Sequence, residues 1–228
     1  MINSFPALAA LALVLPTAAV AVPPEATQQA AESAVVEEKP GPSIGAQRVA
    51  DWIASSGDNA SLPYLVIDKP TASLRLFDAK GKMLAEAPVL IGIAAGDDAT
   101  PGIGAKNLSE IGPAEKTTPA GRYLAKFGLA VGRERVLWVD YATSVAIHPI
   151  PKTAPKKERR RQRMLSATSD DNRITFGCIN VPIAFYGKTL RPLFQKKGGY
   201  VYVLPDTKTV EEVFPRLRVE ALRAGSTG

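Results

Sequence analysis

The 228-residue chain contains only one cysteine, Cys178, and one histidine, His148. A single cysteine excludes an internal disulfide, and no other thiol can replace Cys178 in a reaction. Most lone cysteines are small buried apolar residues, and most lone histidines are core or surface residues. Whether these two residues are functional therefore depends on the sequence around them. We expect neither a metal ion nor a cofactor.

Net charge is absent outside one short segment. The formal charge of the chain is +6, and residues 152–163 contain seven Lys and Arg residues and one acidic residue, Glu158. The excess positive charge is therefore confined to one insertion and is not spread over a binding face. No nucleic-acid-binding motif accompanies it, and we expect no nucleic-acid partner.

The first 15 residues carry no charged side chain and are mostly apolar. Ala19 and Ala21 fit signal-peptide cleavage, which predicts a signal peptide over residues 1–21 and a periplasmic or other extracytoplasmic location in the cell envelope. Because no Lys or Arg precedes the apolar run, an uncleaved apolar anchor and a misplaced start codon stay open as alternatives. Pro6, Pro16 and the short apolar run disfavour a stable membrane span, so membrane contact is limited to an uncleaved N-terminus.

Residues 22–47 are rich in Ala, Pro, Glu and Gln and poor in large apolar side chains. Burial cannot repay the entropy of ordering such a segment, so we predict a disordered linker there. One folded domain is predicted over residues 48–205, followed by a C-terminal helix and tail over residues 206–228. The 46% hydrophobic fraction is sufficient for a core of ordinary size.

Short strands are the main elements predicted for this domain. Apolar runs or alternation over strand length predict strands at residues 64–68, 73–77, 83–91, 123–127, 135–139, 144–148 and 199–204. Helices are expected at residues 48–55, from Pro182 to about 195, and up to residue 214. Asp206 or Thr207 is the expected N-cap of the last helix. The fold is therefore predicted to be mainly β with a few short helices.

Gly177 stands immediately before Cys178 in the stretch Arg173–Val181, which reads Arg-Ile-Thr-Phe-Gly-Cys-Ile-Asn-Val. A glycine lets a reacting carbonyl approach the sulfur and meet main-chain N–H donors. One thiol, one imidazole and a tight glycine step are the minimum parts of a thiol acyl-transfer site. We predict Cys178 as the nucleophile, His148 as the base, and the N–H groups of Gly177 and Cys178 as oxyanion donors. If strand pairing brings His148 within hydrogen-bond reach of Cys178, we expect a thiolate–imidazolium pair, stabilised modestly by the nearby N-terminus of the helix that starts at Pro182.

The order Thr-x-Gly-Cys-hydrophobic-Asn at residues 175–180, with a histidine upstream, resembles the signature of the L,D-transpeptidase catalytic domain family. The segment Lys116–Tyr123, Lys-Thr-Thr-Pro-Ala-Gly-Arg-Tyr, is a second similar feature, and the resemblance covers residues 63–205. It implies that residues 48–205 form a single catalytic domain built on a β-sandwich or mixed sheet. It also implies that Cys178 attacks a tetrapeptide stem of peptidoglycan, releases D-alanine and passes the acyl group to an amine. The Lys116–Tyr123 segment then shapes the substrate side of the sheet, or else it is a surface loop that merely forms turns.

The sequence departs from the family pattern at three places. Phe176 stands where many members have a second histidine, and Pro149 follows the base where Gly or Ser is common. The basic insertion also lengthens the segment between base and nucleophile. These changes leave the upstream histidine and the cysteine in place, so activity is expected and the donor specificity is open.

Four residues near the nucleophile are predicted to contact substrate: Arg173, Thr175, Phe176 and Asn180. Ion pairing and turn formation are alternative roles for Arg173 and Asn180. Residues 152–163 join base to nucleophile, and we predict that they form a mobile, partly helical lid that attracts the carboxylates of stem peptides. The alternative is a solvated basic helix that faces away from the cleft.

Three functions remain open from the sequence. The first is a peptidoglycan L,D-transpeptidase, which forms a thioester and transfers the acyl group to an amine. The second keeps the Cys-His site but uses water as acceptor, which gives a peptidoglycan amidase or crosslink hydrolase. The third is a non-catalytic protein that binds an anionic envelope polymer. The expected partners are peptidoglycan stem peptides, with a carbapenem as inhibitor, and the expected state is a monomer.

Overall fold

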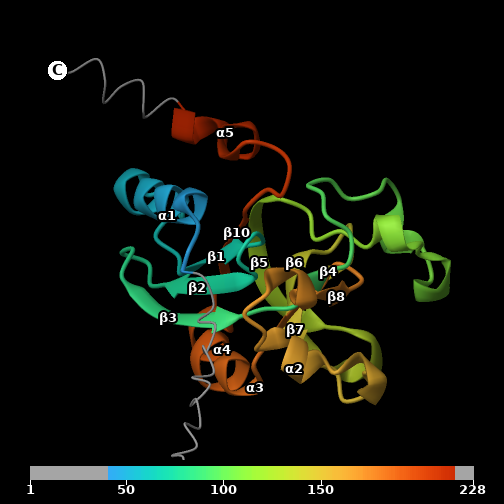
Figure 1. Ribbon diagram of the computed structural model, residues 1–228. Helices are drawn as coiled ribbons and strands as arrows, with labels where there is room; N and C mark the ends of the chain where they lie inside the picture. Colours follow the sequence, from blue (N-terminus) through green and yellow to red (C-terminus); the bar gives the residue numbers. More distant parts are fainter. Residues whose placement is uncertain (1–40, 219–228) are drawn as a thin grey trace, which may run out of the picture. The chain divides into compact units, whose positions relative to one another are not determined.

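The computed structural model describes residues 41–218, which lie within one compact unit (Figure 1). The predicted signal peptide (1–21), most of the predicted linker (22–47) and the last ten residues of the tail lie outside this range. Within it, no helix has the length and apolarity needed to cross a membrane.

An eight-stranded mixed sheet runs in the order β3-β2-β1-β10-β5-β6-β7-β9, and β4 pairs with β8 in a second, two-stranded sheet. Pairs β1–β10, β7–β9 and β4–β8 are parallel and the others are antiparallel. The prediction of a mainly β fold with a mixed sheet and short helices is confirmed. The strands are β1 (Tyr64–Asp68), β2 (Ser73–Phe77), β3 (Met83–Pro88), β4 (Ile91–Gly92), β5 (Gly121–Leu129), β6 (Arg135–Asp140), β7 (Val145–Pro149), β8 (Arg173–Thr175), β9 (Ile179–Val181) and β10 (Gly199–Val203).

The helices are short, apart from α1. The α-helices are α1 (Ile44–Ser56), α2 (Arg160–Met164), α3 (Ile183–Phe185), α4 (Arg191–Phe194) and α5 (Val210–Val213). A π-helical segment, η7 (Tyr186–Leu190), joins α3 to α4 without a break, so the predicted helix from Pro182 to about 195 is confirmed. Short 3₁₀ turns are η1 (Ile103–Ala105), η2 (Leu108–Glu110), η3 (Pro113–Glu115), η4 (Val131–Arg133), η5 (Lys156–Glu158) and η6 (Ser169–Asn172).

Helix α1 begins four residues before the predicted start at residue 48. Ser43 caps it, because its hydroxyl accepts a hydrogen bond from the N–H of Ala46 and its own N–H donates to Asp68. Gly57 ends the helix in the left-handed conformation. Residues 44–47 of the predicted linker are therefore helical.

The predicted strand over residues 83–91 is wrong as one element. It divides into β3 and β4, because Leu90 forms an antiparallel bridge with Asn180 next to the nucleophile. The predicted N-cap of the last helix is also wrong. Thr209 caps α5, and its hydroxyl accepts from the N–H of Glu212.

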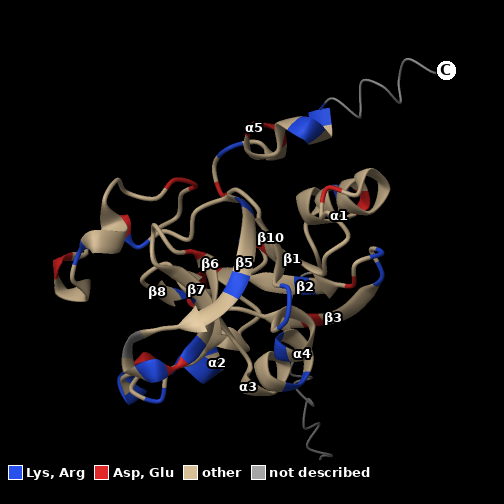
Figure 2. Cartoon of the chain, turned by 180° about the vertical axis from the view of Figure 1, so that it is seen from behind, with Lys and Arg blue, Asp and Glu red and all other residues tan. Residues whose placement is uncertain are grey.

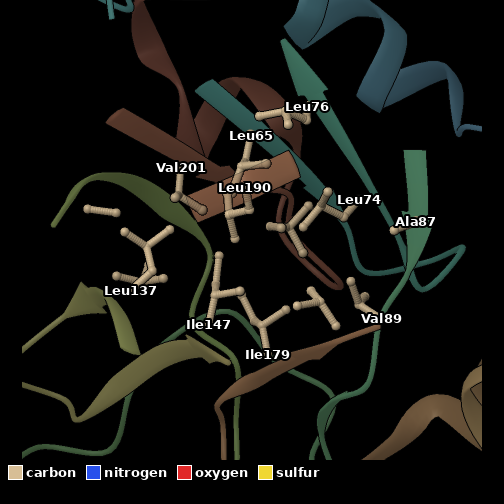
Figure 3. Close-up of a cluster of buried hydrophobic side chains, with 14 of the residues drawn as sticks. Leu65, Leu74, Leu76, Ala87, Val89, Leu137, Ile147, Ile179, Leu190 and Val201 are labelled. Carbon is tan, nitrogen blue, oxygen red and sulfur yellow. The ribbon is translucent and has the colours of Figure 1, made fainter. Parts of the chain in front are cut away.

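Two apolar clusters lie on opposite faces of the large sheet. One combines α1 with β1, β2, β10 and the segment around Phe214. The other contains side chains from strands at both ends of the sheet order, such as Leu74 on β2 and Ile179 on β9, together with Leu190 of the continuous helix 183–194. Figure 3 shows Leu74, Ile147, Ile179 and Leu190 converging in this second cluster. The strands that carry His148 and flank Cys178 are thus anchored in the main core.

A buried ion network ties together three distant segments. The ammonium of Lys69, at the end of β1, lies 3.0 Å from a carboxylate oxygen of Asp97 and 3.2 Å from one of Asp206. It also donates to the carbonyl oxygens of Gly96 and Thr118. Burial acts to raise the pKa of Asp97, but hydrogen bonds from backbone N–H groups of residues 206–208 and from the hydroxyl of Thr207 hold it well below its usual range.

Replacing Lys69 by methionine should lower the free energy of unfolding by about 3–5 kcal/mol, because the buried carboxylate of Asp97 then loses its counter-charge, while Asp206 keeps only its pair with Arg173. The side chains of Lys69 and Asp97 are fully buried. Denaturant unfolding measures the change. Lys208→Met is the matched control, since it removes a solvent-exposed pair with Asp98 and should leave the unfolding curve where it was. Equal curves for Lys69→Met and the control would contradict a stabilising role for the network.

Candidate active site

Cys178 lies in a turn between β8 and β9, and Gly177 makes this turn possible. The φ angle of Gly177 is +124°, a region that residues with a Cβ rarely adopt. A Cβ at this position would also lie 2.7 Å from the carbonyl oxygen of Thr117. The nucleophile turn is therefore packed backbone against backbone on the residues that precede β5.

Two threonine hydroxyls brace this turn. Thr175 donates to the carbonyl oxygen of Cys178 at 2.6 Å and accepts from the N–H of Gly177 at 3.2 Å. Thr118 donates to the carbonyl oxygen of Gly177 at 2.8 Å and accepts from the N–H of Gly92 at 2.9 Å. Because Thr118 is buried, its segment is not a surface loop that merely forms turns. It supports the nucleophile directly.

The thiol of Cys178 is half-buried beside the start of β7. Sγ lies 3.6 Å from the carbonyl oxygen of Ser144, which accepts from the thiol. Burial raises the pKa of Cys178, while the backbone N–H of Ala146 and the positive charge of Arg160 act in the opposite direction. The net effect is a raised pKa, so the resting thiol is protonated at neutral pH.

His148 lies on β7, directly beside Asn180 of the neighbouring parallel strand. Ile147 and Ile179 point into the main core, so alternation places His148, Asn180 and Cys178 on the opposite face of the sheet. Because His148 faces Asn180, Cys178 is its diagonal neighbour, one step before the start of β9. The fold thus brings the predicted base and nucleophile to one face of adjacent strands.

The imidazole of His148 is oriented by its own backbone. Nδ1 lies 2.8 Å from the carbonyl oxygen of Pro149, which can only accept, so Nδ1 carries the proton and Nε2 has the free lone pair. Burial lowers the pKa of His148, which favours the neutral ring at neutral pH. Within residues 41–218 no hydrogen bond joins the imidazole to Sγ. The resting site is therefore a neutral thiol and a neutral imidazole, which corrects the expected thiolate–imidazolium pair.

The geometry also bears on the two predicted oxyanion donors and on the predicted effect of the helix N-terminus. The N–H of Gly177 already donates to Thr175, whereas the N–H of Cys178 has no partner within the described residues, so it is the only one of the two predicted oxyanion donors that is free. The helix after Pro182 begins at Ile183, beyond the three residues of β9. Five residue steps of largely extended chain, about 16 Å, separate the first helical residue from Cys178. The effect of a helix dipole falls off within the first turn of the helix, so this helix does not stabilise a thiolate at Cys178.

The predicted substrate contacts have partners within the protein. Arg173 pairs with Asp206 at 2.7 Å, and the exposed ring of Phe176 lies under the ammonium of Lys116 at 3.8 Å. Asn180 is 1% exposed, and its Oδ1 accepts from Arg160. The hydroxyl of Thr175 is used within the turn. Contact of these four residues with substrate stays a prediction.

Arg160 is a site residue that the motifs do not reveal. It belongs to the basic insertion, and Nη1 donates to Oδ1 of Asn180 at 2.9 Å. Its positive charge acts to lower the pKa values of both Cys178 and His148, after the larger effect of burial. The run of basic residues between base and nucleophile is the sequence signal that could have identified it.

No group of three or more His, Cys, Asp and Glu side chains in residues 41–218 is arranged to hold a metal ion. No protein-family model matches the chain, and no curated protein matches it. Among solved structures, the L,D-transpeptidase (residues 123–326) from Xylanimonas cellulosilytica DSM 15894 is similar, with a TM-score of 0.37 and 13% identity. The match covers 63% of this chain and 60% of that structure.

Gly177→Ala should lower the free energy of unfolding by about 1–3 kcal/mol, because it forces strained backbone and a clash with Thr117. Urea unfolding measures this loss. Gly187→Ala is the matched control, since Gly187 is helical and nothing lies within 4 Å of its added Cβ. The control should be neutral or slightly stabilising. A Gly177→Ala protein as stable as the control would show that the turn tolerates a side chain.

Alkylation of Cys178 by iodoacetamide should rise with pH through a midpoint above the ordinary thiol value of about 8.5, because burial favours the uncharged thiol. The rate of adduct formation, followed by mass spectrometry across the pH range, gives this midpoint. The same thiol in denaturant is the control and should titrate at the ordinary value. A folded-state midpoint at or below the denatured one would mean that thiolate is favoured in the resting site.

Proposed function

We propose that this chain is a peptidoglycan L,D-transpeptidase, a cysteine acyltransferase that works through a thioester. The observation that supports it most is the pairing of the only thiol with the only imidazole on one sheet face, with Nε2 free to accept a proton. The motif at residues 175–180 and the Lys116–Tyr123 segment supply the substrate class by their resemblance to that family. The proposal includes a periplasmic or other extracytoplasmic location and a monomeric state.

The acylation step needs a proton acceptor near Sγ. As Sγ attacks the carbonyl carbon at the third residue of a tetrapeptide stem, Nε2 of His148 takes the thiol proton. The backbone N–H of Cys178 donates to the developing oxyanion. The C–N bond then breaks, and the imidazolium returns its proton to the departing amine of D-alanine. The result is a thioester on Cys178 and a neutral His148.

Transfer to the acceptor reverses these roles. An amine of a second stem attacks the thioester carbonyl, His148 takes a proton from that amine, and the C–S bond breaks as the thiolate leaves. The imidazolium then reprotonates the thiolate, which restores the resting neutral pair. The same steps with water as acceptor give a hydrolase, so product analysis separates the two.

The test is mass spectrometry of the products from disaccharide-tetrapeptide stems. The wild-type protein should release D-alanine and form crosslinked dimers, and a carbapenem should add one drug mass to it. Cys178→Ala should abolish dimers and adduct, and His148→Ala should lower turnover about 10²- to 10⁴-fold with the fold retained.

Three outcomes would contradict the proposal. Release of D-alanine with only free tripeptide as the acyl product would indicate a hydrolase. A drug adduct that persists on Cys178→Ala would exclude Cys178 as the nucleophile. Absence of any product or adduct from the folded wild-type protein would leave the non-catalytic binding function.

A further inference from the structure

The basic insertion forms a cationic cleft, and one residue of its lining, Arg160, bonds to Asn180, two residues after Cys178. A cleft of about 520 Å³ lies within residues 150–162 and is lined by four basic side chains, Lys156, Arg159, Arg160 and Arg161. Figure 2 shows Lys and Arg residues gathered on α2 and on the segment beside it. The insertion does not face away from the site, because Met164 at the end of α2 is buried and Arg160 reaches Asn180 on β9.

Arg160 connects this cleft to the catalytic turn. Its side chain is 12% exposed, Nε donates to Glu158 at 2.6 Å, and Nη1 donates to Oδ1 of Asn180 at 2.9 Å. Within residues 41–218 these bonds leave Nη2 for a ligand. Nδ2 of Asn180 is buried and has no hydrogen-bond partner in the same range. Arg160 and Asn180 thus form a hydrogen-bonded pair in which both side chains keep unused N–H donors, two residues along the chain from Cys178.

The separation between Cys178 and Asn180 matches the length of a substrate that has one amino-acid residue after the cleaved bond. Asn180 and Cys178 lie on the same side of their strand, about 7 Å apart. One peptide residue spans at most about 3.6 Å, and a charged N–H···O bond adds about 2.8 Å. Together these two lengths are close to the separation of Cys178 and Asn180 along the strand, so the carboxylate of the residue after the attacked carbonyl can lie beside Asn180, to which Arg160 is bonded. A planar guanidinium is the side chain best suited to bind it.

We propose that Arg160 binds the free C-terminal carboxylate of the donor stem, which makes it the residue that selects stems ending one residue beyond the cleaved bond. This inference rests on the proposed function for its substrate class. Glu158 holds the guanidinium in place, and the other basic side chains of the cleft raise the local concentration of anionic peptide. The ligand class is a peptide with a free α-carboxylate, as opposed to an amidated or extended stem.

Binding to the Cys178→Ala protein tests this without turnover. Calorimetry compares a tetrapeptide stem that ends in D-alanine with the same stem as its C-terminal carboxamide, which differs by one negative charge. The acid should bind about 10- to 100-fold more tightly than the amide. Adding Arg160→Gln should bring the ratio of acid to amide affinity close to one. Arg160→Lys should restore part of the preference for the acid, because lysine supplies the positive charge but not the planar guanidinium.

Lys157→Gln is the matched control. It removes the same charge from the insertion but does not line the cleft, so the ratio of acid to amide binding should stay at the parent value. If Arg160→Gln weakens acid and amide equally, Arg160 only supports Asn180 and the inference is wrong. Equal binding of acid and amide to the parent protein, or no binding of either, would also overturn it. Failure of transpeptidation with the acid preference intact would instead count against the proposed reaction alone.

Discussion

Close backbone packing at Gly177 determines where the only thiol points. A side chain at Gly177 would collide with the carbonyl of Thr117, and one at Gly92 would collide with that of Lys116. These two glycines let three segments that are distant in sequence pack against one another, and the hydroxyl of Thr118 bonds to both glycines. The position of Cys178 is therefore determined by contacts made largely outside the motif that contains it.

Burial then decides how the thiol can react. It raises the pKa of Cys178 and lowers that of His148, so both changes oppose a charged pair in the resting protein. A neutral thiol can still give its proton to the free Nε2 during attack, because general base catalysis needs reach and a lone pair more than a preformed ion pair. Arg160 partly offsets the effect of burial on the thiol, and it does so from the insertion.

The sequence predicts the parts of this fold whose signals are local. Strands such as β1 and β2 are long enough to show continuous or alternating apolar residues, and Cys178 and His148 are identified by being unique. Strands β8 and β9 have three residues each, which is too few for a periodic signal. The partners of Lys69 and the contact between Arg160 and Asn180 join distant segments, so only the folded chain shows them.

The insertion is separate from the packing that supports the nucleophile. Gly177 is supported by residues 116–118 and by Thr175, whereas Arg160 bonds to the side chain of Asn180 on β9. In the proposed function, the turn at Cys178 carries out the reaction and Arg160 selects the peptide. Phe176 is exposed on the same turn, and its ring lies under the ammonium of Lys116.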